Sequence, residues 1–208
     1  DNLVLIYNGE IYNYLEIKQE LEKLGYRFYS NGDTEVLIKS FHCWGTKAFN
    51  KFEGMWAFAI YNKSDGRFIL SRDRFGEKPL FYYQTEDGLY FASEISCIKI
   101  LANKQFDLDY NQIKRYLING YKSIFKTDST FYKKIKNFPK SSYLNITRDK
   151  VITFKKFWKF NQKIDNAMTR EDAIDLTKEK LIRATELRLR SDVPLAFCMS
   201  GGVDSNCL

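Results

Sequence analysis

The 208-residue sequence predicts an α+β domain that is followed by the start of an α/β domain. From Met55 to Glu94, apolar residues recur with a period of two, which is typical of antiparallel strands. Before this block, residues 14–24 and 33–44 have the apolar spacing of helices that lie against such a sheet. Residues 193–200 form a continuous apolar run, which favours a parallel strand buried on both faces.

The opening stretch, LVLIYNGEIYN, begins as an apolar strand and is predicted to break into a turn at Asn8-Gly9. Asn13 and Glu16 have the spacing of a capping box, so we expect a helix to begin there. Gly25 lies where a C-terminal cap is expected and should end this helix.

A second helix is expected to begin at Asp33 and to end before Gly45. Four strands should follow it, because four period-two segments come next in the chain. They are MWAFAIYN, GRFILSRD, PLFYYQ and LYFASE, with TEDG as the hairpin turn between the last two.

Beyond residue 106 the pattern is mixed. A helix should begin at Asp109 or Asn111 and end at Gly120, and a hairpin that turns at TRDK should follow it. Aromatic residues make up 16 % of the chain, so large rings should fill much of the core.

Residues 161–169 contain few apolar side chains and are interpreted as a linker between two domains, residues 1–162 and 163–208. Thr169 and Asp172 have the spacing of a cap and should start a long helix. The apolar run 193–200 then leads into the loop SGGVDS, after which another helix is expected.

The net charge of +7 comes from 33 Lys and Arg residues against 26 Asp and Glu residues. A basic chain could bind nucleic acid, but the basic residues of this chain are scattered along it. We interpret them, including the cluster KKIKNFPK, as a solvated surface, so no nucleic-acid partner is expected.

No window approaches the ~18 apolar residues of a membrane span and no signal region opens the chain, so we expect no membrane partner and a cytoplasmic location. His42 is the single histidine, which excludes a histidine-based triad or a multi-histidine metal site within the chain. The cysteines are far apart and are interpreted as reduced thiols: Cys43, Cys97, Cys198 and Cys207.

The loop SGGVDS has the composition of an anion site. Gly201 and Gly202 leave backbone N–H groups open to a ligand, and the helix expected after them adds a partial positive charge. Ser200 and Ser205 can donate from their hydroxyl groups. The loop is neither a Walker A sequence nor a GxGxxG sequence, and a plain turn between strand and helix is the alternative.

The stretch YNGEIYN contributes a second set of polar groups. A side-chain amide and a backbone N–H exposed together at Asn8-Gly9 could stabilise a tetrahedral oxyanion. Glu10 and Asp33 are carboxylates near expected helix starts. They could cap those helices, or they could together hold an ammonium group.

The terminal loop resembles the PP-loop of ATP pyrophosphatases, which split ATP into AMP and pyrophosphate as they adenylate a substrate. The resemblance implies ATP and Mg²⁺ as cofactors, with Asp204 as a ligand of the ion and Met199 against the adenylate. The residues implied to cradle the pyrophosphate are Ser200, Gly201, Gly202, Asp204 and Ser205.

Six motifs occur in the order seen in the asparagine synthetase B family: NGEIYN, GDTE, FEGMWAFAIYN, RDRFGEKPLFYY, FASEI and SGGVDS. That family begins with a class II glutamine amidotransferase domain. The resemblance therefore implies an α+β, N-terminal-nucleophile αββα sandwich, here incomplete, followed by the start of an α/β PP-loop domain.

Carried over residue by residue, the resemblance implies that Asn8 and Gly9 form the oxyanion hole. It implies that Glu10 and Asp33 bind the amino group of substrate glutamine. A further signature is interpreted as mainly structural, or as shaping the route of ammonia: Arg72, Asp73, Gly76 and Lys78.

The sequence also departs from the family. The family's nucleophile is an N-terminal cysteine, and an arginine holds the glutamine carboxylate; both precede the NGE motif there, and neither is present here. Residue 1 is Asp, and none of the four cysteines fits the nucleophile's place. Pro139-Lys140-Ser141 stands where the family usually has Pro-Gly. The chain is therefore expected to be a piece of a longer protein that lacks both ends.

The function implied for the parent protein is glutamine-dependent and ATP-dependent amidation, in which ammonia displaces AMP from an adenylated carboxylate. Aspartate is the default acceptor, giving asparagine, AMP and pyrophosphate, and a homodimer is the expected assembly. Two alternatives stay open: a cyclase of the β-lactam synthetase kind with an inactive glutaminase domain, and a truncated product without catalysis. The intact residues Asn8, Gly9, Glu10 and Asp33 favour the amidotransferase.

Overall fold

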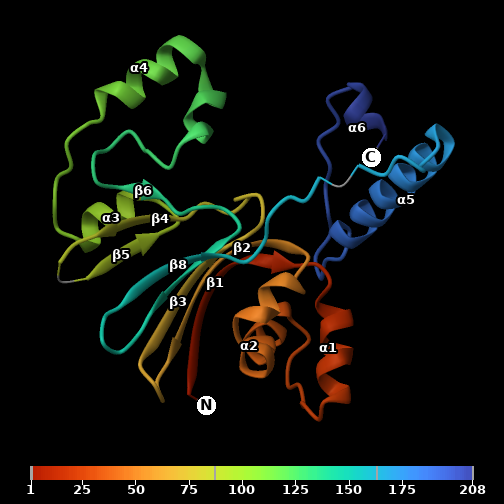
Figure 1. The fold of residues 1–208 in the computed structure, drawn as a ribbon, viewed down its shortest axis with the longest axis horizontal. Helices are drawn as coiled ribbons and strands as arrows, with labels where there is room; N and C mark the ends of the chain where they lie inside the picture. The colour runs from red at the N-terminus through yellow and green to blue at the C-terminus, as the bar shows by residue number, and fades with distance from the viewer. Residues whose placement is uncertain (1, 87, 163, 208) are drawn as a thin grey trace. The chain divides into compact units, whose positions relative to one another are not determined.

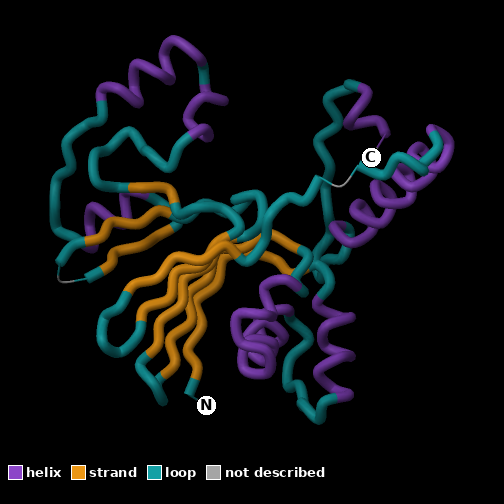
Figure 2. Tube along the Cα trace, in the orientation of Figure 1, coloured by secondary structure: helices purple, strands orange, loops and turns teal. Residues whose placement is uncertain are grey.

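The computed structural model describes residues 2–86, 88–162 and 164–207, and the chain divides into two compact units, Asp1–Lys159 and Phe160–Leu208. Figure 1 draws the elements and Figure 2 separates helices from strands. No helix among the described residues is long and apolar enough to cross a membrane.

The first unit contains two antiparallel sheets. One has five strands in the order β1-β2-β3-β7-β8, and the other has three in the order β5-β4-β6. The strands are β1 (Leu3–Ile11), β2 (Gly54–Asn62), β3 (Arg67–Arg72), β4 (Phe81–Gln84), β5 (Leu89–Ala92), β6 (Lys136–Asn137), β7 (Ser142–Ile146) and β8 (Ile152–Lys156). The helices are α1 (Tyr14–Lys23), α2 (Asp33–Trp44), α3 (Ile95–Leu101) and α4 (Tyr110–Asn119), with 3₁₀ turns at Gly45–Asn50 and Tyr121–Lys126.

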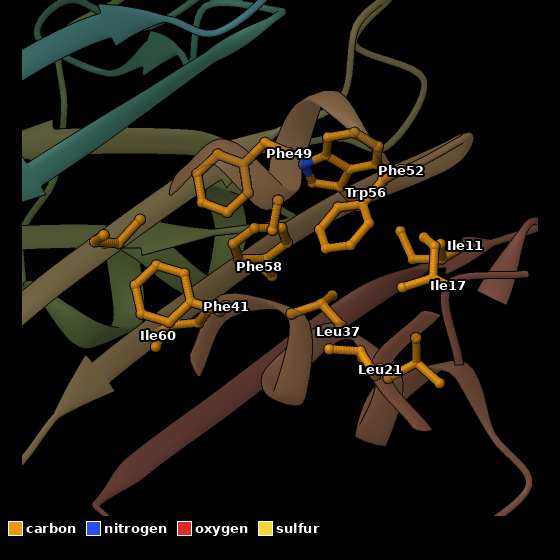
Figure 3. Packing of buried hydrophobic residues seen from close by; sticks show 13 residues of the cluster. Ile11, Ile17, Leu21, Leu37, Phe41, Phe49, Phe52, Trp56, Phe58 and Ile60 are labelled. Carbon is orange, nitrogen blue, oxygen red and sulfur yellow. The ribbon is translucent and has the colours of Figure 1, made fainter. Parts of the chain in front are cut away.

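Three apolar clusters hold these elements in four layers. The largest lies between α1, α2 and one face of the five-stranded sheet, and Figure 3 shows its aromatic centre. A second cluster joins the two sheets, with Ala57 and Leu144 from one and Tyr82 and Phe91 from the other. A third joins the three-stranded sheet to α3 through Tyr83 and Ile98. The order helix, sheet, sheet, helix is the expected αββα sandwich.

Large rings fill the main cluster, as the composition predicts. Trp56 is fully buried on β2, and its indole N–H donates to the Ser71 hydroxyl at 3.2 Å. Phe49 meets Phe58 and Tyr143 edge-on, with ring centroids 5.3 and 5.5 Å apart. Such edge-to-face pairs are the favoured aromatic geometry, so these rings hold the 3₁₀ turn Gly45–Asn50 against β2 and β7.

Two predictions near the start of the chain are wrong. β1 does not break at Asn8-Gly9, because β2 pairs with it along its whole length, up to Ile11 opposite Gly54. Asn13 precedes α1, but its side chain makes no cap and the capping box is absent. Instead the Asn13 amide donates to the Lys51 carbonyl and accepts from the Glu53 N–H, at 2.9 and 2.8 Å.

Most of the other elements expected for the first unit are confirmed. Asp109 caps α4 with its side chain, Gly120 follows the helix, and β7 and β8 form the hairpin around TRDK. β4 and β5 pair antiparallel, and the Thr85 N–H donates to the Gly88 carbonyl at 2.9 Å. Asp87 in the TEDG turn lies outside the described residues.

The second unit contains α5 (Arg170–Arg188) and α6 (Val203–Cys207). The capping box of Thr169 and Asp172 is confirmed on both sides. The strand predicted at 193–200 is wrong, since these residues form no strand and all are exposed, Cys198 included. A parallel strand requires neighbouring strands, and the described residues of this unit supply none.

Glu35 fixes the first turn of α2, the helix that carries Asp33. Its carboxylate accepts from the Ser30 N–H at 2.6 Å, from the Ser30 hydroxyl at 2.7 Å, and from Lys39 and the Tyr29 N–H. Partial burial opposes ionisation, but these hydrogen bonds, led by Lys39, lower the pKa of Glu35 to about 2. The ionised form is therefore stabilised in the folded chain.

We expect this depressed pKa to make stability depend on pH. Stability from Glu35 is complete above the unfolded pKa of about 4.3 and is lost as pH falls towards about 2. Glu35→Gln should therefore lower the free energy of unfolding by about 2 kcal/mol at pH 6 and by about half as much at pH 3. Urea unfolding of both chains at the two pH values measures this difference. An equal loss at both pH values would contradict the assignment.

Candidate functional site

Asn8 lies on β1, the end strand of the five-stranded sheet, and faces the other sheet. Its amide Nδ2 donates to the Ser93 hydroxyl at 3.2 Å, just beyond β5. Both residues line a hollow of about 200 Å³ between the sheets, together with Ala57 and Phe91. Asn8 is exposed, so its amide is available at the mouth of this hollow.

Gly9 turns its N–H away from β2. At the two ends of the β1–β2 ladder, the Lys63 N–H donates to the Asn2 carbonyl and the Tyr12 N–H to the Glu53 carbonyl. Hydrogen-bonded pairs alternate along an antiparallel ladder, so even-numbered residues of β1 bond to β2. The N–H of Gly9 therefore points to the outer edge of β1, where the described residues pair no further strand.

Gly9 also has a structural reason to be glycine. A Cβ on it would lie 2.4 Å from the Met55 carbonyl oxygen and 2.7 Å from the Trp56 Cα. No side chain fits at such distances, so the close approach of β1 to β2 requires glycine here. The edge N–H and the close approach are compatible roles of the same residue.

The Asp33 side chain links the start of α2 to the outer edge of β1. Its Oδ2 accepts from the Tyr7 hydroxyl at 2.7 Å and from the Ile11 N–H at 2.9 Å. Gly32, not Asp33, is the N-cap of α2, and no side-chain cap is formed there. The capping alternative therefore does not describe Asp33. Its other oxygen, Oδ1, has a weak 3.4 Å contact from the Thr34 hydroxyl.

The pKa of Tyr7 is affected by two negatively charged side chains at this edge. Burial, followed by the Asp33 and Glu10 carboxylates, raises the pKa of the Tyr7 hydroxyl far above its usual range. The hydroxyl stays protonated and donates to Asp33. Two carboxylates acting on one partly buried group form a local negative field, which suits a bound ammonium group. Tyr7 is not among the site residues that the sequence predicts, because no local signal marks it and its contact with Asp33 spans 26 residues.

The RDRFGEKP segment is a compact loop around one buried carboxylate. Asp73 is fully buried and accepts from five backbone N–H groups at 2.6–3.3 Å: those of Trp56, Phe75, Gly76, Glu77 and Lys78. Arg72 donates to the carbonyl oxygens of Gly76, Lys78 and Phe138 at 2.7–2.8 Å. Every one of these bonds is internal, so the geometry supports the structural interpretation.

The SGGVDS loop lies in the second unit. The hydroxyl oxygens of Ser200 and Ser205 are 3.1 Å apart, and the Gly202 N–H points to Ser200 Oγ at 3.4 Å. Gly201 has a φ of +76°, which favours glycine. Apart from Gly201 itself and its two chain neighbours, no atom lies within 4 Å of the position that a Cβ on Gly201 would occupy. Two hydroxyl groups and an uncovered glycine backbone are donors of the kind that a phosphate-binding loop uses.

Asp204 lies in the first turn of α6 and is exposed, as is Met199 before the loop. The described residues contain no group of three or more metal-ligating side chains. Mg²⁺ is commonly held by one or two carboxylates together with phosphate oxygens, so a single carboxylate beside a phosphate loop fits that ion. The loop and Asp204 thus fit a metal–phosphate group better than a metal alone.

Comparisons with known proteins give two family matches. Residues 1–158 match the glutamine amidotransferase domain, and residues 176–208 match asparagine synthase. Glutamine-hydrolysing asparagine synthetase 1 of Bacillus subtilis is 36 % identical over 203 residues, covering 97 % of this chain and 31 % of that protein. Putative asparagine synthetase 2 of Methanocaldococcus jannaschii is 32 % identical, covering 99 % of this chain and 39 % of that protein.

Among solved structures, the fold is similar to that of glutamine phosphoribosylpyrophosphate amidotransferase from Bacillus subtilis. The TM-score is 0.53 at 20 % identity, over 75 % of this chain and 29 % of that one. This likeness shows the N-terminal-nucleophile amidotransferase fold. The chain spans about a third of the length of the curated relatives it matches. The chain belongs to the glutamine amidotransferase domain family, and its residues 176–208 match asparagine synthase.

Proposed function

We propose that this chain is part of a glutamine-dependent and ATP-dependent amidotransferase of the cytoplasm. Residues 1–162 would release ammonia from glutamine, and the domain that begins at residue 163 would adenylate a carboxylate, with aspartate as the default acceptor. One observation carries the proposal. The same chain has both a polar strand edge suited to an amide substrate and a glycine-serine loop suited to pyrophosphate.

In the first domain, the donors for the oxyanion would be the Asn8 amide and the Gly9 N–H. Both belong to the β1 edge, and the Asn8 amide has a second proton besides the one given to Ser93. Preorganised donors of this kind lower the barrier because they need no reorientation as the negative charge develops. No cysteine lies among the described residues that line the Asn8 hollow, so the nucleophile of the family is assigned to no residue here.

Glu10 and Asp33 would hold the α-ammonium group of glutamine. Oδ2 of Asp33 is already engaged by Tyr7 and Ile11, which fixes the carboxylate and leaves Oδ1 for the substrate. A charge held in place by the fold loses little entropy on binding. Tyr7 is a positioning residue in this scheme, since it acts on the substrate through Asp33.

In the second domain, Ser200, Ser205 and the backbone of Gly201 and Gly202 would hold the pyrophosphate of ATP. Asp204 would hold Mg²⁺, which neutralises phosphate charge when bound. Met199 is exposed immediately before the loop and would contact the adenylate. These roles rest on the loop geometry and on the match of residues 176–208 to asparagine synthase.

Asp33→Asn in the complete amidotransferase tests the clamp. Glutamine-dependent product formation should fall about ten- to hundredfold, because a charge-assisted hydrogen bond to the substrate is lost. Product formation from added ammonia should stay unchanged, because it bypasses the glutaminase site. Steady-state assays with each nitrogen source measure the two rates.

Tyr7→Phe is the matched control, since it removes the 2.7 Å bond to Asp33 and keeps the charge. It should raise the KM for glutamine less than Asp33→Asn does. If Asp33→Asn lowered both activities equally together with the melting temperature, Asp33 would be a structural tie and the clamp would be wrong.

A further inference from the structure

Five lysines line the side of the sandwich where β6 and β8 end their sheets. Lys134, Lys136 and Lys150 line a hollow of about 990 Å³, and Lys155 and Lys156 line an adjoining hollow of about 340 Å³. Tyr82 borders both hollows. We call this surface the lysine groove: Lys134, Lys136, Lys150 and Lys156 around Tyr82.

The strand register places the side chains of two of these lysines on strand faces that look into the space between the sheets. Lys136 lies directly opposite Tyr82 in the β4–β6 pair, so the two side chains share a face. Lys156 is two residues beyond Phe154 on β8, so it shares the face of that ring. The rings of Tyr82 and Phe154 meet at 5.9 Å between the sheets. Lys136 and Lys156 therefore border one groove from opposite sheets.

None of the four ammonium groups has an ion-pair or hydrogen-bond partner within the described part of the chain. Lysines elsewhere do have partners, as Lys39 has Glu35 and Lys51 has Glu20. The groove brings together lysines that are far apart in the sequence. Like charges gathered on one surface repel one another, and a bound anion would relieve that repulsion.

Two lysines of the groove are also held in an unfavourable backbone conformation. Lys134 has a φ of +70° and Lys150 a φ of +59°, where glycine is the favoured residue. A non-glycine residue in this region costs of order 1 kcal/mol. Retaining a long cationic side chain at both positions is consistent with a use for the charge.

The remaining polar groups set the chemistry of the ligand. Burial, followed by the Asp128 carboxylate, raises the pKa of Tyr82, so its hydroxyl stays protonated and can donate. Glu86 lines the larger hollow, which places a negative charge on the β4–β5 side. An anion would therefore lie on the side of the lysines, away from Glu86.

We propose that the lysine groove binds a di- or triphosphate group, either as a free anion or as part of a nucleotide. Its three or four negative charges match four unpaired ammonium groups, which a single carboxylate does not. The groove belongs wholly to the first unit and is formed by residues other than the β1 edge and the SGGVDS loop. The proposal does not depend on the amidotransferase activity.

Titration calorimetry of the 208-residue chain tests this at 0.15 M salt, with pyrophosphate, tripolyphosphate and ATP as separate probes. Lys136→Gln with Lys156→Gln should weaken binding about 4- to 25-fold, at about two- to fivefold per lysine. Lys150→Gly should weaken it two- to fivefold without lowering the melting temperature, since glycine adopts the same φ freely. Lys133→Gln is the control, because Lys133 is exposed beside Lys134 and lines neither hollow.

Equal affinity for tripolyphosphate and ATP would support a site that reads phosphate alone, and tighter binding of ATP would support a nucleotide site. Binding that Lys133→Gln weakens as much as the double variant would overturn the groove. So would the absence of binding by all three probes, because the lysines would then serve to keep the β6 and β8 edges from pairing with other chains. In that case the double variant should aggregate, which analytical sedimentation detects.

Discussion

Replacing Asp73 by alanine is expected to lower the free energy of unfolding of the first unit by about 3–5 kcal/mol. The carboxylate is fully buried and is the shared acceptor of five backbone N–H groups. Each buried donor left without an acceptor costs about 1–3 kcal/mol, reduced where water can enter. Urea unfolding followed by tryptophan fluorescence measures the change. Trp56 is a suitable probe because it is buried and its backbone N–H is one of the five donors to Asp73.

Two further variants separate the buried charge from a general effect of losing an aspartate. Asp73→Asn keeps one acceptor oxygen but points an NH₂ group at other donors, so it should cost less than alanine and remain destabilising. Asp65→Ala removes an exposed aspartate that pairs with Arg67 at the surface, and it should cost under about 1 kcal/mol. An Asp73→Ala chain as stable as Asp65→Ala would show that the loop does not depend on its carboxylate.

The same loop shows what a sequence can and cannot predict. A motif match marked Arg72, Asp73, Gly76 and Lys78 together, and a mainly structural role was the interpretation. Their mutual bonds span two to six residues, apart from those to Trp56 and Phe138. Bonds across 17 and 66 residues follow from how β2 and β3 pair and from the segment before β7, which no local pattern contains.

The two errors near the start of the chain have a common cause, which is competition from tertiary partners. Asn-Gly is a strong turn signal, yet β2 pairs with β1 through Asn8 and Gly9, and the pairing requires a residue without a Cβ. Asn13 has a cap's position, but the loop at Lys51 and Glu53 offers its amide two better-placed partners. In both cases a long-range contact decided between two local structures that the sequence alone permits.

The sequence suggests the main residues of the candidate site but not the residues that support them. Asn8, Gly9, Glu10 and Asp33 were identified from motif and chemistry, and Asp33 does reach the β1 edge. Tyr7 and Ser93 were not identified, because their contacts cross 26 and 85 residues. The supporting bonds of a site depend on which elements meet in space, and a sequence gives that only through a known fold.

Substitutions in the SGGVDS loop of the second unit should reduce the proposed synthesis more than substitutions elsewhere. In the complete amidotransferase, Asp204→Ala is expected to abolish ATP–pyrophosphate exchange and to leave glutamine hydrolysis largely intact. Pyrophosphate leaves with several negative charges, and Mg²⁺ neutralises them only where a carboxylate holds the ion beside the phosphates. The hydrolysis of an amide forms no such charge, so the glutaminase half should not respond.

The competing role for Asp204 is to stabilise the first turn of α6, where a negative side chain interacts favourably with the positive end of the helix dipole. That role predicts a loss of about 1 kcal/mol and near-normal exchange. Asp172→Ala is the matched control, since it removes an aspartate of the same charge from the capping box of α5 in the same unit. Exchange should survive Asp172→Ala and fail with Asp204→Ala. Exchange that survives both, with a lowered melting temperature for each, would leave Asp204 as a helix-stabilising residue and remove it from the metal site.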